Sequence, residues 1–250
     1  MFEFIEPLPF FLAAIVIFGA YFIFGVSGFG SSIVAVPLLV QIYPLKSVVP
    51  MMVMIDICGS LYLGKKNSSN ADMKELKWLF PFTLIGIVVG GLVLLQAPSA
   101  PLLVTLGVFA AINGARVLWQ RNRELHKAIN RWWAAPFGFF GGIFTALFAT
   151  GGAIYASYLG LRIADPRALR STMAFAIFIL TFLRLCLMVA TGLLLSWPVF
   201  GLAICLMPAT FLGIWAGSHM HARLSNSAMR VAYGSILLFS GTTLLMRQLV

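Results

Sequence analysis

The chain contains an apolar stretch, residues 9–43, that is too long for one ordinary membrane crossing and is interrupted by glycines. The hydrocarbon core of a bilayer needs about 20 helical residues. The interruption lies at residues 25–39, which read GVSGFGSSIVAVPLL. Glycine permits sharp turns and close approach of other atoms. Irregular backbone at membrane depth is tolerated only where it is buried in protein or lines a cavity. The stretch therefore predicts a membrane helix that is broken for a functional reason.

A second glycine-rich segment, residues 145–158 with the sequence TALFATGGAIYASY, lies midway along the chain. A shift of 121 positions places Gly30 on Gly151, and a shift of 127 places Gly86 on Gly213. Gly86 and Gly213 each begin a GxxxG pattern, which we expect to pack helices together. An internal repeat of this kind predicts two copies of one structural unit. We expect a first transmembrane repeat over 1–120, a basic cytoplasmic linker over 121–132 and a second transmembrane repeat over 133–250.

The composition is that of a polytopic membrane protein. The chain is 61% hydrophobic and 10% charged, with a mean hydropathy of +0.99, which is too apolar to cover a water-exposed surface. We expect an all-α fold in the cell inner or plasma membrane. The first apolar run follows acidic residues rather than a basic region, so we expect it to remain as a membrane segment. Further crossings are predicted at 47–64, 78–96, 101–119, 169–191, 197–217 and 229–249.

The basic residues predict the orientation of these crossings. The net charge is +10, but Lys and Arg lie in short linkers between apolar segments, which is typical of cytoplasmic loops rather than of nucleic-acid binding. If the linkers 64–77, 120–131, 161–170 and 218–230 are all cytoplasmic, each long apolar run must enter and leave on one side. The prediction is two inverted four-segment repeats, each opening with a glycine-broken hairpin or re-entrant segment, with both termini external. In the alternative, each run crosses once, the repeats are parallel and one basic linker is external.

The two glycine breaks are the candidate binding site. Both precede apolar helical stretches, and the unpaired N–H groups at a helix start favour anions. Hydroxyl groups lie beside both breaks. In the alternative, the glycines serve only close helix packing. The candidate substrate-binding residues at the breaks are Ser27, Gly28, Gly30, Ser31, Ser32, Thr150, Gly151, Gly152 and Ala153.

Two charged residues lie within predicted crossings, Asp56 and Arg184. A charge in lipid is unfavourable, so each should face the protein interior, pair, or reach the interface. They occupy corresponding crossings of the two copies and could meet at the centre. Arg184 would then bind a sulfo or carboxyl group bidentately, and Asp56 could couple transport to a proton. The alternative is a structural ion pair, or two separately satisfied polar residues.

The sequence carries no motif of an enzyme. It lacks a phosphate-binding GKS/T loop, HExxH, GxSxG and a carboxylate pair at helical spacing. We therefore expect no catalytic residues, no cofactor and no metal site.

The chain resembles the sulfite exporter TauE/SafE family of membrane transporters. The resemblance rests on the segment GxxGFGSSxxxVPLL after the first apolar stretch, the GG-containing echo midway and the duplicated four-segment halves. It covers essentially the whole chain, and it implies transport of sulfite, sulfonates and related small anions. The second copy departs from the family pattern, because Tyr155 and Tyr158 stand where small residues or proline are expected. Such aromatic walls would suit an organic sulfonate or carboxylate as well as sulfite.

Together these features predict a secondary transporter, an exporter of a small sulfur-containing or organic anion that works by alternating access between inverted repeats. The alternatives are an anion channel and a non-transporting membrane scaffold or assembly factor. The expected partners are the anionic substrate, the lipid bilayer and a coupled proton, and no nucleic acid. The substrate, the direction of transport, the coupling ion and the choice between a monomer and a homo-oligomer stay open.

Overall fold

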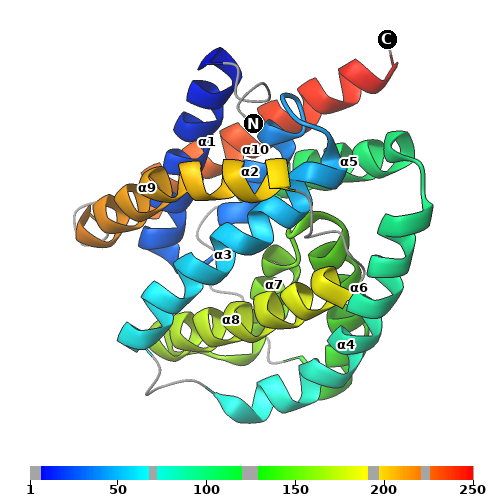
Figure 1. Ribbon diagram of the computed structural model, residues 1–250. Helices are drawn as coiled ribbons and strands as arrows, with labels where there is room; N and C mark the ends of the chain where they lie inside the picture. The colour runs from blue at the N-terminus through cyan, green and yellow to red at the C-terminus, as the bar shows by residue number, and fades with distance from the viewer. Residues whose placement is uncertain (1–6, 68–71, 120–128, 191–196, 221–225, 250) are drawn as a thin grey trace.

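The protein is all-helical in the computed structural model over the residues that it describes, which are 7–67, 72–119, 129–190, 197–220 and 226–249 (Figure 1). The first predicted repeat contains five helices among the described residues: α1 (Pro7–Ser27), α2 (Ser31–Leu39), α3 (Leu45–Asn67), α4 (Met73–Gln96) and α5 (Ser99–Trp119). The second predicted repeat contains a 3-10 turn, η2 (Arg131–Trp133), and then α6 (Ala134–Phe148), α7 (Gly152–Arg162), α8 (Pro166–Ala190), α9 (Trp197–Met220) and α10 (Asn226–Leu249).

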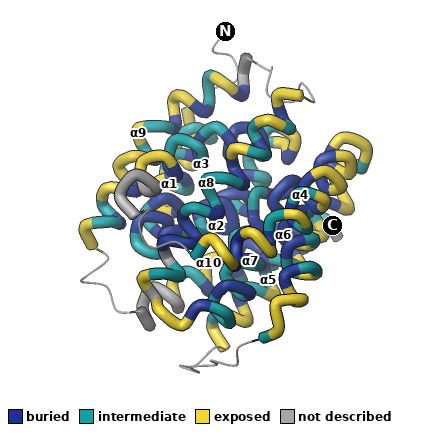
Figure 2. The backbone as a smooth tube through the Cα atoms, turned by 90° about the horizontal axis from the view of Figure 1, so that it is seen from below, coloured by how far each residue is buried: buried dark blue, intermediate teal, exposed yellow. Residues whose placement is uncertain are grey.

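Six helices among the described residues are long and apolar enough to cross a membrane. α10 has sufficient length but is less apolar. Large apolar side chains such as Phe11, Ile85 and Phe239 are exposed on the outer faces, as is expected of a surface in contact with lipid. Figure 2 shows this distribution, with exposed residues around the periphery and buried ones at the centre. The candidate spans are Pro7–Ser27, Leu45–Tyr62, Met73–Gln96, Ser99–Trp119, Arg167–Ala190 and Val199–Met220.

The predicted crossings match helices with small differences at their ends. The largest difference is in α4, which begins at Met73 rather than at residue 78. Asp72 explains the earlier start, because its carboxylate accepts hydrogen bonds from the backbone amides of Lys74 and Glu75 and so caps the helix.

Each long apolar run consists of one longer helix followed by one short helix. α2 has 9 residues and α7 has 11, or about 14 and 17 Å at 1.5 Å per residue, whereas the hydrocarbon core is about 30 Å thick. Neither can cross alone. Each packs against the helix before it, and the ring of Tyr155 in α7 lies against Gly141 of α6, so α7 folds back along α6.

The two breaks differ in the backbone conformation of their matched glycines, Gly30 and Gly151. Gly28 and Gly30 have φ values of 80° and 94°, in the left-handed region that favours glycine. The position that matches Gly28 under the shift of 121 is Ala149, which is also left-handed with φ 62°. Gly151 has an ordinary φ of −58°, but a Cβ atom there would collide with the Thr145 hydroxyl. The first break therefore needs glycine for its conformation, and the second needs it for space.

Glycines bring helices of opposite copies together, as the GxxxG patterns predict. α4 packs on α6, where a Cβ at Gly86 would meet the carbonyl of Phe139. α9 packs on α1, where a Cβ at Gly213 would meet the carbonyl of Phe18. Gly86 corresponds to Gly213 under the shift of 127, and Phe18 corresponds to Phe139 under the shift of 121. The same contact therefore occurs twice, each time between the two predicted repeats.

α5 and α10 pack against each other through a reciprocal set of glycines. A Cβ at Gly107 would approach the carbonyl of Gly241, and a Cβ at Gly114 would approach the carbonyl of Gly234. Because residue numbers rise along one helix as they fall along the other, α5 and α10 run antiparallel. Gly107 corresponds to Gly234 and Gly114 to Gly241 under the shift of 127, so each contact recurs with its partners exchanged.

We expect Gly217→Val to destabilise the fold by about 1–3 kcal/mol, as overpacking does. A Cβ there would collide with the carbonyl of Phe22 in α1, close to Gly25. Gly201→Val is the matched control on the same helix, because no atom lies within 4 Å of its added Cβ. The melting temperature of the purified protein in detergent measures both. A Gly217→Val protein that melts with the wild type would contradict the packing role.

Candidate functional site

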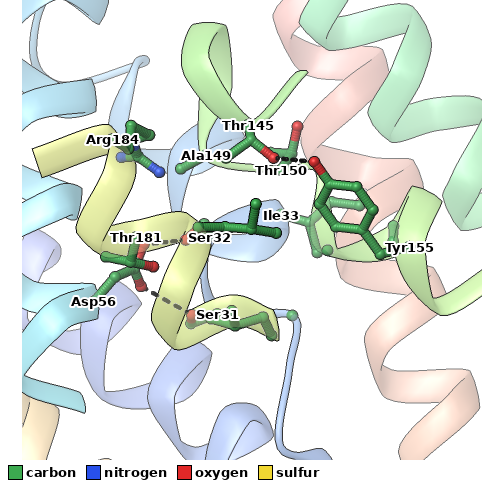
Figure 3. A pocket seen from close by; sticks show the side chains of 15 residues that line it. Ser31, Ser32, Ile33, Asp56, Thr145, Ala149, Thr150, Tyr155, Thr181 and Arg184 are labelled. Carbon is green, nitrogen blue, oxygen red and sulfur yellow. Dashed lines mark hydrogen bonds between the residues drawn. The ribbon is translucent and has the colours of Figure 1, made fainter. Parts of the chain in front are cut away.

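A pocket lies where the two helix breaks meet (Figure 3). Its cavity volume is about 40 Å³. Residues 30–33 line it from the first break, and α3 contributes Asp56. The second break contributes Thr145, Ala149, Thr150, Gly152, Ala153 and Tyr155, and α8 contributes Ile177, Leu180, Thr181 and Arg184. Residues of both predicted repeats therefore line one pocket.

Asp56, a residue of α3, is buried beside the first turn of α2, where its carboxylate is hydrogen-bonded to three hydroxyl groups. Its carboxylate accepts hydrogen bonds from the hydroxyls of Tyr21, Ser31 and Ser32, at 3.1 Å from Ser31 Oγ and 2.6 Å from Ser32 Oγ. The N-cap of α2, Gly30, supplies no side-chain cap. A helix N-terminus stabilises a negative charge. Asp56 thus occupies the position beside α2 where an anion is favoured.

Arg184 lies in the same pocket and is 1% exposed. Its Nη2 donates to the backbone carbonyl of Val49 at 3.0 Å, while its Nε has no partner among the described residues. The ion pairs in the described part of the chain join Glu75 to arginines and do not include Arg184. The alternative of a direct structural ion pair with Asp56 is therefore not what the structure contains. A buried cation without a carboxylate is unfavourable unless a ligand completes it.

The second break presents a further unpaired polar group. Thr150 is 1% exposed, and its hydroxyl has no hydrogen-bond partner within the described ranges. The neighbouring Thr145 is satisfied, because its Oγ1 donates to the carbonyl of Gly141 at 2.7 Å and lies 3.2 Å from the Tyr155 hydroxyl. The N-cap of α7, Gly151, supplies no side-chain cap. The first-turn amides of Ala153 and Ile154 donate to the carbonyls of Thr150 and Gly151 at 3.4 and 3.0 Å, so the unpaired polar group at this break is the Thr150 hydroxyl rather than the helix amides expected from the sequence.

The structure brings most of the predicted site residues together. Three do not line the pocket: Ser27, Gly28 and Gly151. Ser27 holds the break itself, since its hydroxyl contacts the carbonyls of Ile23 and Phe29 at 2.8 and 2.6 Å. The predicted residues that line the pocket are Gly30, Ser31, Ser32, Asp56, Thr150, Gly152, Ala153 and Arg184.

Two polar residues were missed by the sequence reasoning: Thr181, which lines the pocket, and Tyr21, which donates to Asp56. A signal existed for Thr181, which precedes Arg184 by three positions and so shares its helix face. Tyr21 is a polar side chain in an apolar helix, a weaker signal. The two tyrosines that were predicted as aromatic walls lie in different places. Tyr155 lines the pocket, whereas Tyr158 lies outside it and its hydroxyl donates to Glu75 at 3.1 Å.

A second charged cluster stabilises the C-terminal end of α7, at Arg162. The carboxylate of Glu75 at the start of α4 is buried and accepts from Arg162 Nη2 at 2.6 Å and Nε at 3.2 Å, and from Arg131 Nε at 3.2 Å. Arg162 also donates to the carbonyl of Ile129 at 2.8 Å. The cluster joins α4, α7 and the segment before α6, and it fixes the helix whose other end forms the pocket.

We expect Arg162→Ala to lower the melting temperature clearly and Arg131→Ala to change it little. The Arg162 side chain is 18% exposed and forms two bonds to a buried carboxylate, whereas the Arg131 side chain is 47% exposed and forms one. Exposed ion pairs contribute about 0–1 kcal/mol, and removal of a buried partner costs several times more. Thermal unfolding of the two variants tests the ranking. Equal shifts would show that the bidentate pair does not hold α7.

Two interrupted helices whose ends meet at a buried, charged pocket inside a bundle of apolar helices are typical of membrane transporters. The chain belongs to the sulfite exporter TauE/SafE family, whose model matches residues 12–244. It is similar to a curated protein named "Probable inner membrane transporter protein TsaS" from Comamonas testosteroni, with 20% identity over 194 residues, which cover 78% of this chain and 81% of that protein. No solved structure matches the chain. The family agrees with the expectation that the protein is not an enzyme.

Proposed function

We propose that the protein is a secondary transporter, an exporter, which moves a small sulfur-containing or organic anion such as sulfite, a sulfonate or a carboxylate. The observation that carries the proposal is Arg184, a buried guanidinium that lines the pocket and has no carboxylate within ion-pair distance in the described part of the chain. A guanidinium binds planar or tetrahedral oxyanions in a fixed geometry. The family description, sulfite exporter, supports the same class of substrate.

The mechanism that we propose is alternating access between two inverted repeats, residues 1–120 and 133–250. Two observations support the inversion. α5 and α10, which occupy equivalent places in the two copies, run antiparallel through reciprocal glycine contacts. The α1–α9 and α4–α6 contacts recur between the copies. Inverted repeats place a substrate site between two halves, and rocking of one half against the other then exposes it to each side in turn.

The membrane placement in this proposal follows the basic linkers. With the linkers between the apolar segments on the cytoplasmic side, both termini are external, and α2 and α7 are re-entrant segments. The relative named as a probable inner membrane transporter supports an inner-membrane location.

Asp56 is the proposed coupling residue. It is a buried carboxyl group held by three hydroxyl donors, and it shares a pocket with Arg184. A proton on Asp56 would neutralise the negative charge that otherwise repels an incoming anion. Binding of the anion and of a proton would then favour each other, so the two would cross together, outward wherever the outward gradient of the anion exceeds the inward gradient of the proton.

Uptake of radiolabelled sulfite into proteoliposomes that contain the purified protein tests the proposed function. We expect uptake that saturates with sulfite concentration and that unlabelled sulfite inhibits. Competition by thiosulfate, taurine, sulfoacetate and acetate then orders the substrates. Uptake of every one of these anions no faster than in protein-free vesicles would contradict the proposal.

A further inference from the structure

The two helix breaks in the pocket differ in what already occupies them. We infer that the α2 break is filled by the chain's own carboxylate, Asp56, and that the transported anion binds at the α7 break, held by Thr150 and Arg184. This inference rests on the proposed function and assigns its binding site. The repeat alone would predict an equivalent anion site at each break. We infer instead that only the α7 break binds the transported anion.

At the α2 break the hydroxyl donors are already used. Ser31 and Ser32 both donate to Asp56, at 3.1 and 2.6 Å, and Tyr21 donates to the same carboxylate. Dashed lines in Figure 3 join Asp56 to the two serines. A second anion there would lie beside the carboxylate and would have no free serine hydroxyl to bind. Like charges at such close range are strongly unfavourable in a buried site.

At the α7 break two polar groups are free. The position that matches Asp56 under the shift of 121 is Ile177, which lines the pocket without a carboxylate. The Thr150 hydroxyl and Arg184 Nε are both buried and have no partner within the described residues. Both residues line the pocket, as do Gly152 and Ala153 in the first turn of α7. An unpaired buried donor is unfavourable unless a ligand satisfies it.

The size of the cavity restricts the anion. A water molecule needs about 10–15 Å³ of such space, so a cavity of about 40 Å³ admits a group of only a few non-hydrogen atoms. The chemistry that fits is a compact oxyanion group. Free sulfite and the sulfonate end of an organic molecule share it, and the two are distinguished by separate titrations.

Calorimetric titration of the purified protein with sulfite, and separately with methanesulfonate, tests the assignment. We expect Thr150→Val to weaken binding by about tenfold or more, because a hydrogen bond to a charged ligand contributes about 1.5–3 kcal/mol. Ser32→Ala should weaken it distinctly less. Thr210→Val is the matched control, since Thr210 is buried outside the pocket and donates to the carbonyl of Leu206 at 3.2 Å.

Thr150→Val should melt with the wild type, because the hydroxyl that it removes has no partner in the unliganded protein. If Ser32→Ala lost as much affinity for the anion as Thr150→Val, or more, the inference would be overturned, but the proposed anion transport would not. An unchanged affinity in Thr150→Val would do the same. Absence of binding to the wild-type protein, together with absence of uptake, would overturn the proposed function as well. Tighter binding of sulfite supports a free ion, and tighter binding of methanesulfonate supports a sulfonate end, both at the α7 break.

Discussion

Replacement of Arg184 by glutamine is expected to reduce anion binding by about 10- to 150-fold, because hydrogen bonds to charged groups contribute about 1.5–3 kcal/mol. The same change is expected to leave the melting temperature unchanged or to raise it. Arg184 is 1% exposed and has no carboxylate within ion-pair distance among the described residues, so before a ligand binds its guanidinium gains only the longer-range attraction of Asp56 in the same pocket. Calorimetric titration with sulfite and thermal unfolding measure the two effects.

The combination of lost binding and preserved stability separates a ligand-binding arginine from a structural one. If Arg184 only held the fold, Arg184→Gln would lower the melting temperature. Arg184→Lys is the matched variant: it retains the charge but loses the planar donor geometry, and we expect an intermediate affinity. Wild-type affinity in Arg184→Gln would remove this residue from the site.

Asp56→Asn is expected to abolish the dependence of transport on a proton gradient while sulfite exchange continues. A gradient of about one pH unit is worth about 1.4 kcal/mol, so a wild-type protein that couples one proton to one anion accumulates the anion about tenfold. The other ionisable side chains that face Asp56 are Tyr21 and Arg184. The asparagine cannot gain or lose a proton in this range. Uptake into proteoliposomes, with and without an imposed gradient, measures the difference.

Tyr21→Phe is the control for this experiment. It removes one hydrogen bond to Asp56 and retains the carboxyl group, so gradient dependence should persist. An Asp56→Asn protein that the gradient still drives would exclude Asp56 as the coupling residue. An Asp56→Asn protein that neither exchanges sulfite nor melts cooperatively would show a structural role instead.

The apolar runs and the glycine repeat predicted the helices and the place of the pocket. The length of an apolar run reflects the thickness of the bilayer, and the position of a glycine reflects local backbone geometry. Both can therefore be recognised in a single sequence. Asp56 and Arg184 were also recognisable, because charges are unfavourable in lipid. The pairing of α1 with α9 and of α4 with α6 could not be read, since the GxxxG patterns show that helices pack but not which ones.

The polar partners were harder to predict than the charges. Nothing along the sequence joins Tyr21 to Asp56, 35 positions away, or Glu75 to Arg162, 87 positions away. The difference between the breaks was also hidden, because Gly30 and Gly151 look equivalent in the repeat but only Gly30 has a positive φ. Such features depend on the three-dimensional arrangement of residues that are distant in the chain.

Counterflow of radiolabelled sulfite tests the central claim most directly. Proteoliposomes are loaded with unlabelled sulfite and diluted into a trace of labelled sulfite. An alternating-access transporter carries label inward as unlabelled anion leaves, so the account predicts transient accumulation of label above equilibrium in the wild type and none in Arg184→Gln. Label that only rises to equilibrium, together with a sulfite-dependent conductance, would contradict the account and indicate a channel.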